Sequence, residues 1–286
     1  MTSSANKHSY KPPVAVGGVG GSGTRLIAQC MDKMEFFLGD DLNQAHDNLW
    51  FALLFTRPEI LTTTDEEFDA LASIYLQAMT GCEPFTTEQI DKVQHLVDQD
   101  RLQHPRAWLQ ERAESLLSPK ETRSTDTLWG WKAPNTHIVL ERLAARFPGM
   151  KYIHVVRNGL DMAFSDNQNQ LKIWGKHFLG DEVQLTPCYS LRYWCLVHKR
   201  VMATGGSMGD NFLFLNYEQF CATPEQGINR LADFLGVSIS DELIQSLTGL
   251  VQAPGTIGRY RSQDISVFDE EDIAYVAELG FDTTTY

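Results

Sequence analysis

Short apolar runs alternate with stretches of helical spacing along this chain of 286 residues. Four runs are predicted strands: the run that begins at Pro13, the run that ends at Lys132, residues 151–156 and residues 211–220. The second and third runs do not alternate apolar with polar residues, which favours parallel strands covered on both faces. We therefore predict an α/β fold with a parallel central β-sheet flanked by helices.

The longest helical stretch lies between residues 58 and 119. Its segments FDALASIYLQAM and EQIDKVQHLVDQDRLQ place apolar residues three and four positions apart, so we predict a helical insertion or lid here. Residues 1–12 are predicted to form a mobile leader, and residues 13–286 a single domain.

Further helical patterns follow later in the chain. We predict a helix that opens at Pro134, and helices in the segments SLRYWCLVHKRVMATGG, PEQGINRLADFLGV, DELIQSLTGLV and DEEDIAYVAELG. A helix is also expected to begin near Gln44, and a loop with a broken helix is expected between Gln168 and Pro187. Five aromatic residues could line an apolar pocket, although core positions are favoured for each: Trp50, Phe51, Phe55, Trp174 and Tyr193.

The composition limits the classes of partner. The chain is 43% hydrophobic and carries a formal net charge of −13, so neither nucleic acid nor an anionic membrane is expected as its main partner. The five cysteines lack C-x-x-C spacing, which predicts neither a disulfide framework nor a metal site. With no apolar leader and no long uncharged apolar run, we expect a cytoplasmic protein without a membrane span.

A glycine-rich stretch, PVAVGGVGGSGTRLIAQCMDKM at residues 13–34, joins the first predicted strand to a helix. The helical pattern opens at Ser22 or Thr24. Glycines allow close backbone approach, and a helix N-terminus directs unpaired N–H groups at the loop. The stretch therefore predicts a phosphate-bearing ligand.

Two nucleotide-binding patterns fit this stretch in part. Three glycines match the G-x-G-x-x-G pattern of dinucleotide-binding folds: Gly18, Gly20 and Gly23. Asp40 or Asp41 lies where such a fold binds the ribose. The outer glycines also match a P-loop, but Thr24-Arg25 stands where that motif requires Lys-Ser or Lys-Thr. A tight strand-to-helix turn without a ligand is the third interpretation.

A second candidate phosphate site follows the predicted strand at residues 151–156. Arg157 comes directly after the strand, and Asp161 and Ser165 follow four residues apart in a predicted helix. The carboxyl end of a parallel strand faces the crevice where open α/β sheets bind ligands. The guanidinium fork suits a phosphate, with the serine hydroxyl as a second donor. Alternatively, Arg157 pairs with Asp161 and fixes the turn.

Three segments together, GVGGSGTRL, VVRNGLDMAFS and FLNYEQFCATPEQGINRLADFLGV, resemble the sulfotransferase family that uses 3′-phosphoadenosine 5′-phosphosulfate (PAPS). The resemblance implies a P-loop-like α/β fold of bacterial type, PAPS as donor and adenosine 3′,5′-bisphosphate (PAP) as product. It implies that the first loop binds the 5′-phosphosulfate through Gly20, Gly21, Ser22, Gly23 and Thr24. It further implies that Arg157 and Ser165 hold the 3′-phosphate, and that a late loop closes over the nucleotide through Gly258, Arg259 and Arg261.

The chain departs from the family pattern at two places. Gly21 occupies the position of a basic residue, and Arg25 is the candidate substitute. Where members carry Lys-Thr-His, this chain has Lys132-Ala133-Pro134, so the lysine is kept and the histidine that acts as base is not. Lys132 could still stabilise charge on the transferring group.

The base must then come from elsewhere. We expect it in the polar patch between Asp40 and Asp47, with Asp47 or His46 as candidates and His137 as the alternative.

These observations predict an enzyme that moves a sulfuryl group from PAPS to a hydroxyl or amine of a small-molecule acceptor, without a metal. The net charge of −13 disfavours a strongly acidic polysaccharide as acceptor. Three other functions stay open: a P-loop kinase or phosphotransferase, an NAD-type oxidoreductase, and a nucleotide-binding protein without activity.

Overall fold

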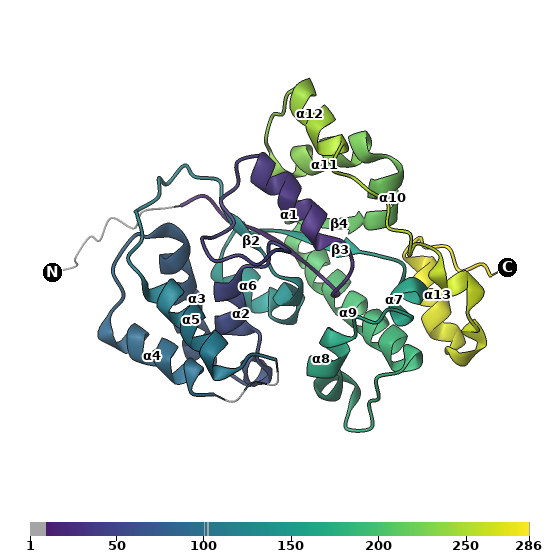
Figure 1. The fold of residues 1–286 in the computed structure, drawn as a ribbon, viewed down its shortest axis with the longest axis horizontal. Helices are drawn as coiled ribbons and strands as arrows, with labels where there is room; N and C mark the ends of the chain where they lie inside the picture. The colour runs from purple at the N-terminus through teal and green to yellow at the C-terminus, as the bar shows by residue number, and fades with distance from the viewer. Residues whose placement is uncertain (1–9, 100, 102, 286) are drawn as a thin grey trace.

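The computed structural model describes residues 10–99, 101 and 103–285, and its centre is a four-stranded sheet (Figure 1). The strands lie in the order β2-β1-β3-β4 and are all parallel. Their bounds are β1 Val14–Gly18, β2 Gly130–Lys132, β3 Lys151–Val156 and β4 Phe212–Asn216. The predicted α/β fold with a parallel sheet flanked by helices is thereby confirmed.

The helices make up most of the rest of the described chain. The α-helices are α1 (Thr24–Lys33), α2 (Leu49–Phe55), α3 (Asp65–Thr80), α4 (Thr87–Val97), α5 (Arg106–Leu117), α6 (Leu140–Arg146), α7 (Gly159–Ala163), α8 (Asn169–Leu179), α9 (Pro187–Met208), α10 (Tyr217–Ala222), α11 (Pro224–Leu235), α12 (Asp241–Thr248) and α13 (Glu270–Glu278). Short 3₁₀ helices are η1 (Pro58–Leu61), η2 (Pro134–Ile138), η3 (Gly209–Asn211), η4 (Arg259–Ser262) and η5 (Ile265–Val267).

Helices cover both faces of the sheet, as the non-alternating strands require. Val14 and Val16 of β1 pack in one core cluster with residues of α1, α11 and α12. Ala15 of β1 and Tyr152 of β3 belong to another, with residues of α2, α3, α5 and α9. In Figure 1, α1, α11 and α12 accordingly lie on one side of the strands, and α2, α6 and α9 on the other.

Helices α3, α4 and α5 occupy most of the stretch between residues 58 and 119 (Figure 1). Thr86 caps α4 in a reciprocal pair with Gln89, which explains why this helix begins where its sequence suggests. The role of residues 58–119 as a lid stays a prediction. The five aromatic side chains that could have lined a pocket are all at most 2% exposed and lie in the main core cluster.

Two local predictions were wrong. No helix begins near Gln44, because the Asn43 side chain accepts hydrogen bonds from the N–H groups of Ala45 and Asp47 and closes a turn instead. Helix α2 starts at Leu49, where Asn48 is its N-cap. Between Gln168 and Pro187, where a loop with a broken helix was expected, the first part is instead the continuous 11-residue helix α8, which packs on α9, and only residues 180–186 form a loop.

The predicted leader falls largely outside the described residues, which begin at residue 10. Lys11 lies against the domain: its carbonyl accepts from Trp129 Nε1 at 2.7 Å, and its N–H donates to the Thr125 carbonyl at 3.3 Å. Among the described residues, no helix has both the length and the hydropathy needed to cross a bilayer.

Candidate functional site

All four strands end at one edge of the sheet. The glycine-rich loop follows β1, Lys132 ends β2, Arg157 follows β3 and Tyr217 follows β4. Because the strands are parallel, their carboxyl ends form a common crevice. Side chains that are far apart in the sequence therefore gather here.

The glycine-rich loop presents backbone groups and a buried hydroxyl. Gly23 is the N-cap of α1, with φ of 97°, and no side chain caps this helix. A Cβ at Gly23 would lie 2.2 Å from the ring of Tyr217, so only glycine fits beneath that ring. Ser22 is buried, and its Oγ has no hydrogen-bond partner in the described chain. An uncapped helix N-terminus beside an unpartnered hydroxyl fits an anion.

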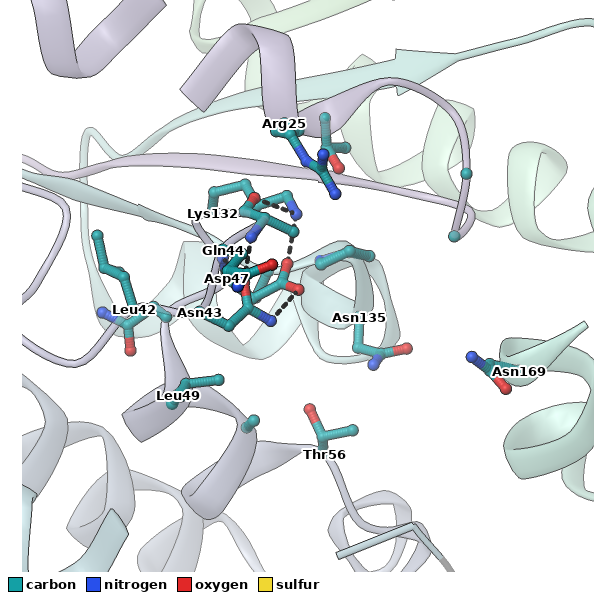
Figure 2. A pocket seen from close by; sticks show the side chains of 18 of the residues that line it. Arg25, Leu42, Asn43, Gln44, Asp47, Leu49, Thr56, Lys132, Asn135 and Asn169 are labelled. Atoms are coloured by element: carbon teal, nitrogen blue, oxygen red, sulfur yellow. Dashed lines mark hydrogen bonds and ion pairs between the residues drawn. The ribbon is translucent and has the colours of Figure 1, made fainter. Parts of the chain in front are cut away.

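Gly21 and Arg25 occupy different environments in this loop. Gly21 has φ of 95°, a conformation that side chains rarely adopt, which explains why no basic residue stands there. Arg25 is exposed in the first turn of α1. Its side chain extends into the cavity that Lys132 and Asp47 also line (Figure 2).

Lys132 is a buried cation with one carboxylate partner. Its side chain is 3% exposed, and Nζ donates to the Asp47 carboxylate and to the Ala45 carbonyl at 3.1 Å. Asp47 also accepts from Asn43 Nδ2 at 2.9 Å (Figure 2). Burial lowers the pKa of Lys132, Asp47 opposes that change, and the positive charge of Arg25 adds to it.

The structure separates the three candidate bases. Asp47 lines the cavity, whereas His46 and His137 do not. His46 has a left-handed backbone conformation with φ of 60°. His137 is buried outside the lining of this cavity, and its Nε2 donates to Gln170 Oε1 at 3.0 Å.

The cavity has a volume of about 1130 Å³, slightly above the range of about 300–1,000 Å³ that is typical of small-molecule sites. One part is formed by the glycine-rich loop, Arg25, Asp47 and Lys132. Another part combines amide and apolar side chains: Leu42, Asn43, Leu49, Asn135, Asn169 and Ile173. The helical stretch adds Trp108, which stacks on His104 with ring centroids 4.0 Å apart.

Comparison with known proteins decides the family. The model of the sulfotransferase family matches residues 12–241. The chain belongs to the sulfotransferase family. This confirms the resemblance on which the sequence prediction rested. No curated protein gives a significant match.

Solved structures of other sulfotransferases resemble the whole chain. The sulfotransferase domain of the olefin synthase from Synechococcus PCC 7002 is 17% identical, with a TM-score of 0.54 over 99% of this chain and 100% of that domain. Sulfotransferase STF9 from Mycobacterium avium is 16% identical, with a TM-score of 0.49 over 96% of this chain and 78% of that chain. Because the identity to the Synechococcus domain is 17%, that comparison supports a shared fold and nothing further.

In this sulfotransferase, the second predicted phosphate site lies next to the cavity rather than in its lining. Arg157 is buried, and its Nη2 donates to Thr256 Oγ1 at 2.7 Å. The alternative pairing of Arg157 with Asp161 does not form: Arg157 Nε lies 4.0 Å from the Glu218 carboxylate instead. The Asp161 carboxylate accepts from the N–H groups of Gly258 and Tyr260 at 2.7 and 3.2 Å. Asp161 therefore ties the late loop to α7.

The remaining predicted residues also lie around α7. Ser165 lies beyond the end of α7, in the following turn, and its Oγ accepts from Asn167 N–H at 3.2 Å. Arg259 donates to the Phe164 carbonyl at 3.2 Å, and Arg261 forms an ion pair with Asp282 at 2.5 Å. All of these lie outside the lining of the large cavity.

The sequence prediction missed three residues near the glycine-rich loop, at the carboxyl ends of the strands. Tyr217 packs on Gly23, and burial raises the pKa of its hydroxyl to about 12. Asn167 lies near Gly20, and Gln170 Nε2 donates to the Gly18 carbonyl at 3.1 Å. Tyr217 could have been found, since it follows a strand as Arg157 does, but the segment was assigned to the strand itself.

Proposed function

We propose that this sulfotransferase uses PAPS as donor and transfers its sulfuryl group to a hydroxyl or amine of a small-molecule acceptor. The observation that carries the proposal is one cavity in which the glycine-rich loop faces the buried Lys132 and its partner Asp47. The loop supplies donors for an anion, and the pair supplies a cation and a carboxylate.

The residues present fit the phosphosulfate end of PAPS. The Ser22 hydroxyl lacks a partner in the described chain and the first turn of α1 has no side-chain cap, so both can donate to anionic oxygens. Arg25 reaches into the cavity and would supply the charge that Gly21 does not. PAPS would contribute an activated sulfuryl group on a good leaving group.

Lys132 would stabilise negative charge on the oxygen that leaves with the phosphate. A cation aimed at developing charge in a site shielded from water is one of the strongest contributions to catalysis. Lys132 is already held at the cavity by burial and by the Ala45 carbonyl.

Asp47 would accept the proton of the acceptor hydroxyl or amine. Its carboxylate is paired with Lys132, and an anionic donor would compete for that cation and free the carboxylate. Asp47 would therefore become available as a base only after the donor has bound. Asn43 holds the second carboxylate oxygen and would keep Asp47 at the cavity.

The 3′-phosphate of the nucleotide would be held at the second predicted phosphate site, at the end of β3. Arg157 and Ser165 would donate to it, with Gly258, Arg259 and Arg261 closing the loop above. The hydrogen bonds from Gly258 and Tyr260 to Asp161 support this arrangement, because they hold the loop beside the strand end that carries Arg157.

The proposal is tested by incubating the full chain with ³⁵S-labelled PAPS and a panel of alcohols, phenols, amines and sugars. We expect a labelled product, in the presence of EDTA as well. PAP should raise the melting temperature, whereas NAD and ATP should not. Stabilisation by NAD or ATP and not by PAP would overturn the assignment, as would PAP binding without product from any acceptor.

A further inference from the structure

The Lys132–Asp47 pair divides the large cavity into two sides (Figure 2). Arg25 extends toward the pair from α1, which lies on the proposed donor side. The opposite side presents three polar side chains: Thr56, Asn135 and Asn169. In an in-line transfer the attacking atom approaches opposite the leaving group, so the acceptor belongs on this second side. We call it the acceptor side.

The three polar side chains of the acceptor side have hydrogen-bonding capacity left for a ligand. Asn135 Oδ1 accepts from Trp174 Nε1 at 3.0 Å, which fixes the amide and leaves Nδ2 to donate elsewhere. Thr56 is 9% exposed, and its hydroxyl makes no hydrogen bond within the described chain. The amide of Asn169 is equally without a partner among the described residues, and in Figure 2 it points toward Asn135.

The helical stretch adds an aromatic wall to the acceptor side. Helix α5 packs on α2, whose C-cap is Thr56. Trp108 of α5 and His104 both line the cavity, and their rings are stacked with 16° between the planes. The guanidinium carbon of Arg112 lies 5.4 Å from the centre of the Trp108 ring. Such a flat wall suits the C–H face of a saturated ring, whose edge then faces the polar side chains.

The charges on this wall are compensated. Arg112 Nε lies 3.0 Å from Asp41 Oδ2, and both side chains line the cavity, at 11% and 13% exposure. Burial, and then the positive charge of Arg101, lower the pKa of His104 to about 4, so this imidazole is neutral at pH 7. A charged acceptor would therefore lose its hydration here without gaining an unpaired opposite charge.

We propose that the acceptor is an uncharged saturated ring with several hydroxyl groups, that is, a sugar or a glycoside. This inference rests on the proposed function, which supplies the donor. One hydroxyl faces Asp47, and the polar side chains of the acceptor side bind the others. In the transfer, the oxygen of that hydroxyl forms the new bond to sulfur and its proton passes to Asp47. The bond between sulfur and the phosphate oxygen breaks, and PAP leaves with its electron pair.

Hydroxyl groups match what these side chains offer. A hydroxyl both donates and accepts, as do the Thr56 hydroxyl and the amide of Asn169, so each contact can form in either direction. A phenol or a simple alcohol brings one hydroxyl, which Asp47 takes, and leaves the other polar groups of a closed site unmatched. A site built to bind hydroxyl groups discriminates strongly against analogues that lack them.

The test measures transfer from ³⁵S-labelled PAPS by the full chain to matched acceptors. The probes are the methyl glycosides of glucose, galactose and mannose, and cyclohexanol, which has a ring and a single hydroxyl. We expect kcat/KM for at least one glycoside to exceed that for cyclohexanol at least about tenfold. Charged forms of that glycoside, with an amine in place of one hydroxyl or a carboxylate in place of the primary alcohol, should be at least about tenfold poorer acceptors.

The outcomes separate this inference from the proposed function. If cyclohexanol or a charged form is used as well as every glycoside, the acceptor class is wrong and the sulfuryl transfer stands. If no acceptor gives a labelled product, the proposed function fails, and saturation-transfer NMR with PAP present still tests the cavity. Signal transfer to a glycoside and not to cyclohexanol would then support the acceptor class, and no transfer to any glycoside would overturn it.

Variants locate the contacts. Thr56→Val and Asn169→Ala should each lower kcat/KM for the glycoside at least about fivefold and that for cyclohexanol less than about twofold. Asn229→Ala, exposed on α11, is the matched control and should change neither. Equal losses for both acceptors, or no loss for the glycoside, would overturn the proposal. Asn169 is exposed at the start of α8, so its replacement removes no core contact.

Discussion

At the scale of single residues, the buried ion pair between Lys132 and Asp47 dominates the proposed chemistry. Burial disfavours the charge on Lys132, and the carboxylate compensates for it. Removing Asp47 leaves the buried charge of Lys132, whose side chain is 3% exposed, without its carboxylate partner. The two residues therefore have to be tested both for turnover and for binding.

Lys132→Met should lower kcat about 100-fold to 1,000-fold, because the cation that stabilises the leaving oxygen is lost. The affinity for PAP, measured by calorimetry, should change much less. Lys172→Met is the matched control, since that lysine is exposed on α8. A kcat within about threefold of the unchanged protein would exclude Lys132 from the reaction.

Asp47→Asn should lower kcat by about 100-fold or more, because the amide keeps the shape and cannot accept the proton. His46→Ala should leave kcat within about twofold, since His46 does not line the cavity. Turnover is measured with PAP binding checked separately. If only His46→Ala abolished turnover, the assignment of the base would be reversed.

Arg25→Ala should weaken PAP binding more than about tenfold, as expected for a charge-assisted contact to a phosphate. Lys33→Ala, at the other end of α1, is the control. Unchanged PAP affinity in Arg25→Ala would show that this side chain does not replace the basic residue missing at Gly21.

At the scale of elements, α8 and η2 brace the glycine-rich loop from behind. Gln170 of α8 donates to the Gly18 carbonyl at the end of β1 and accepts from His137 of η2. The end of β1 is therefore fixed by a side chain that approaches from 152 positions later in the chain. Such bracing holds a binding loop in one conformation before the ligand arrives.

Gln170→Leu should weaken PAP binding by about fivefold, because the Gly18 carbonyl loses its donor and the loop becomes less ordered. Hydrogen exchange should increase at the loop and at the start of α1. Lys172→Leu, two residues further along and on the exposed side of α8, should change neither quantity. Normal loop protection in Gln170→Leu would show that the backbone alone fixes the loop.

At the scale of the whole molecule, three buried histidines connect the sheet to its covering helices. The ring of His154 on β3 lies 6.3 Å from that of His137 and 5.0 Å from that of His198 on α9. Burial lowers the pKa of His137 to about 4 and that of His198 to about 3, and it lowers the pKa of His154 well below its usual range.

This cluster predicts acid sensitivity. Below pH 6.5 the unfolded chain takes up protons at these histidines, and the folded protein does so only near pH 4 or below. The free energy of unfolding should therefore fall by about 1.4 kcal/mol per pH unit for each histidine as the pH drops from about 6.5 to 4. His198→Leu should reduce this slope in urea unfolding, and exposed His177→Gln should not. An unchanged slope in His198→Leu would contradict the prediction.

The sequence determined the fold class and most of the elements. Glycines followed by a helical pattern predicted the loop that joins β1 to α1, and strand β3 was predicted with its observed bounds. These features depend on local conformation and periodicity, which neighbouring residues encode. The three family segments likewise gave the sulfotransferase assignment that the family match confirms.

Only the tertiary structure decided which side chains meet. Asp47 contacts Lys132 across 85 positions, and the turn made by Asn43 places it there rather than the helix expected from the sequence. Gln170, Tyr217 and the buried histidines likewise acquire partners only when the strand order brings their elements together. Periodicity reports whether a residue is covered, but the packing of distant elements determines what covers it.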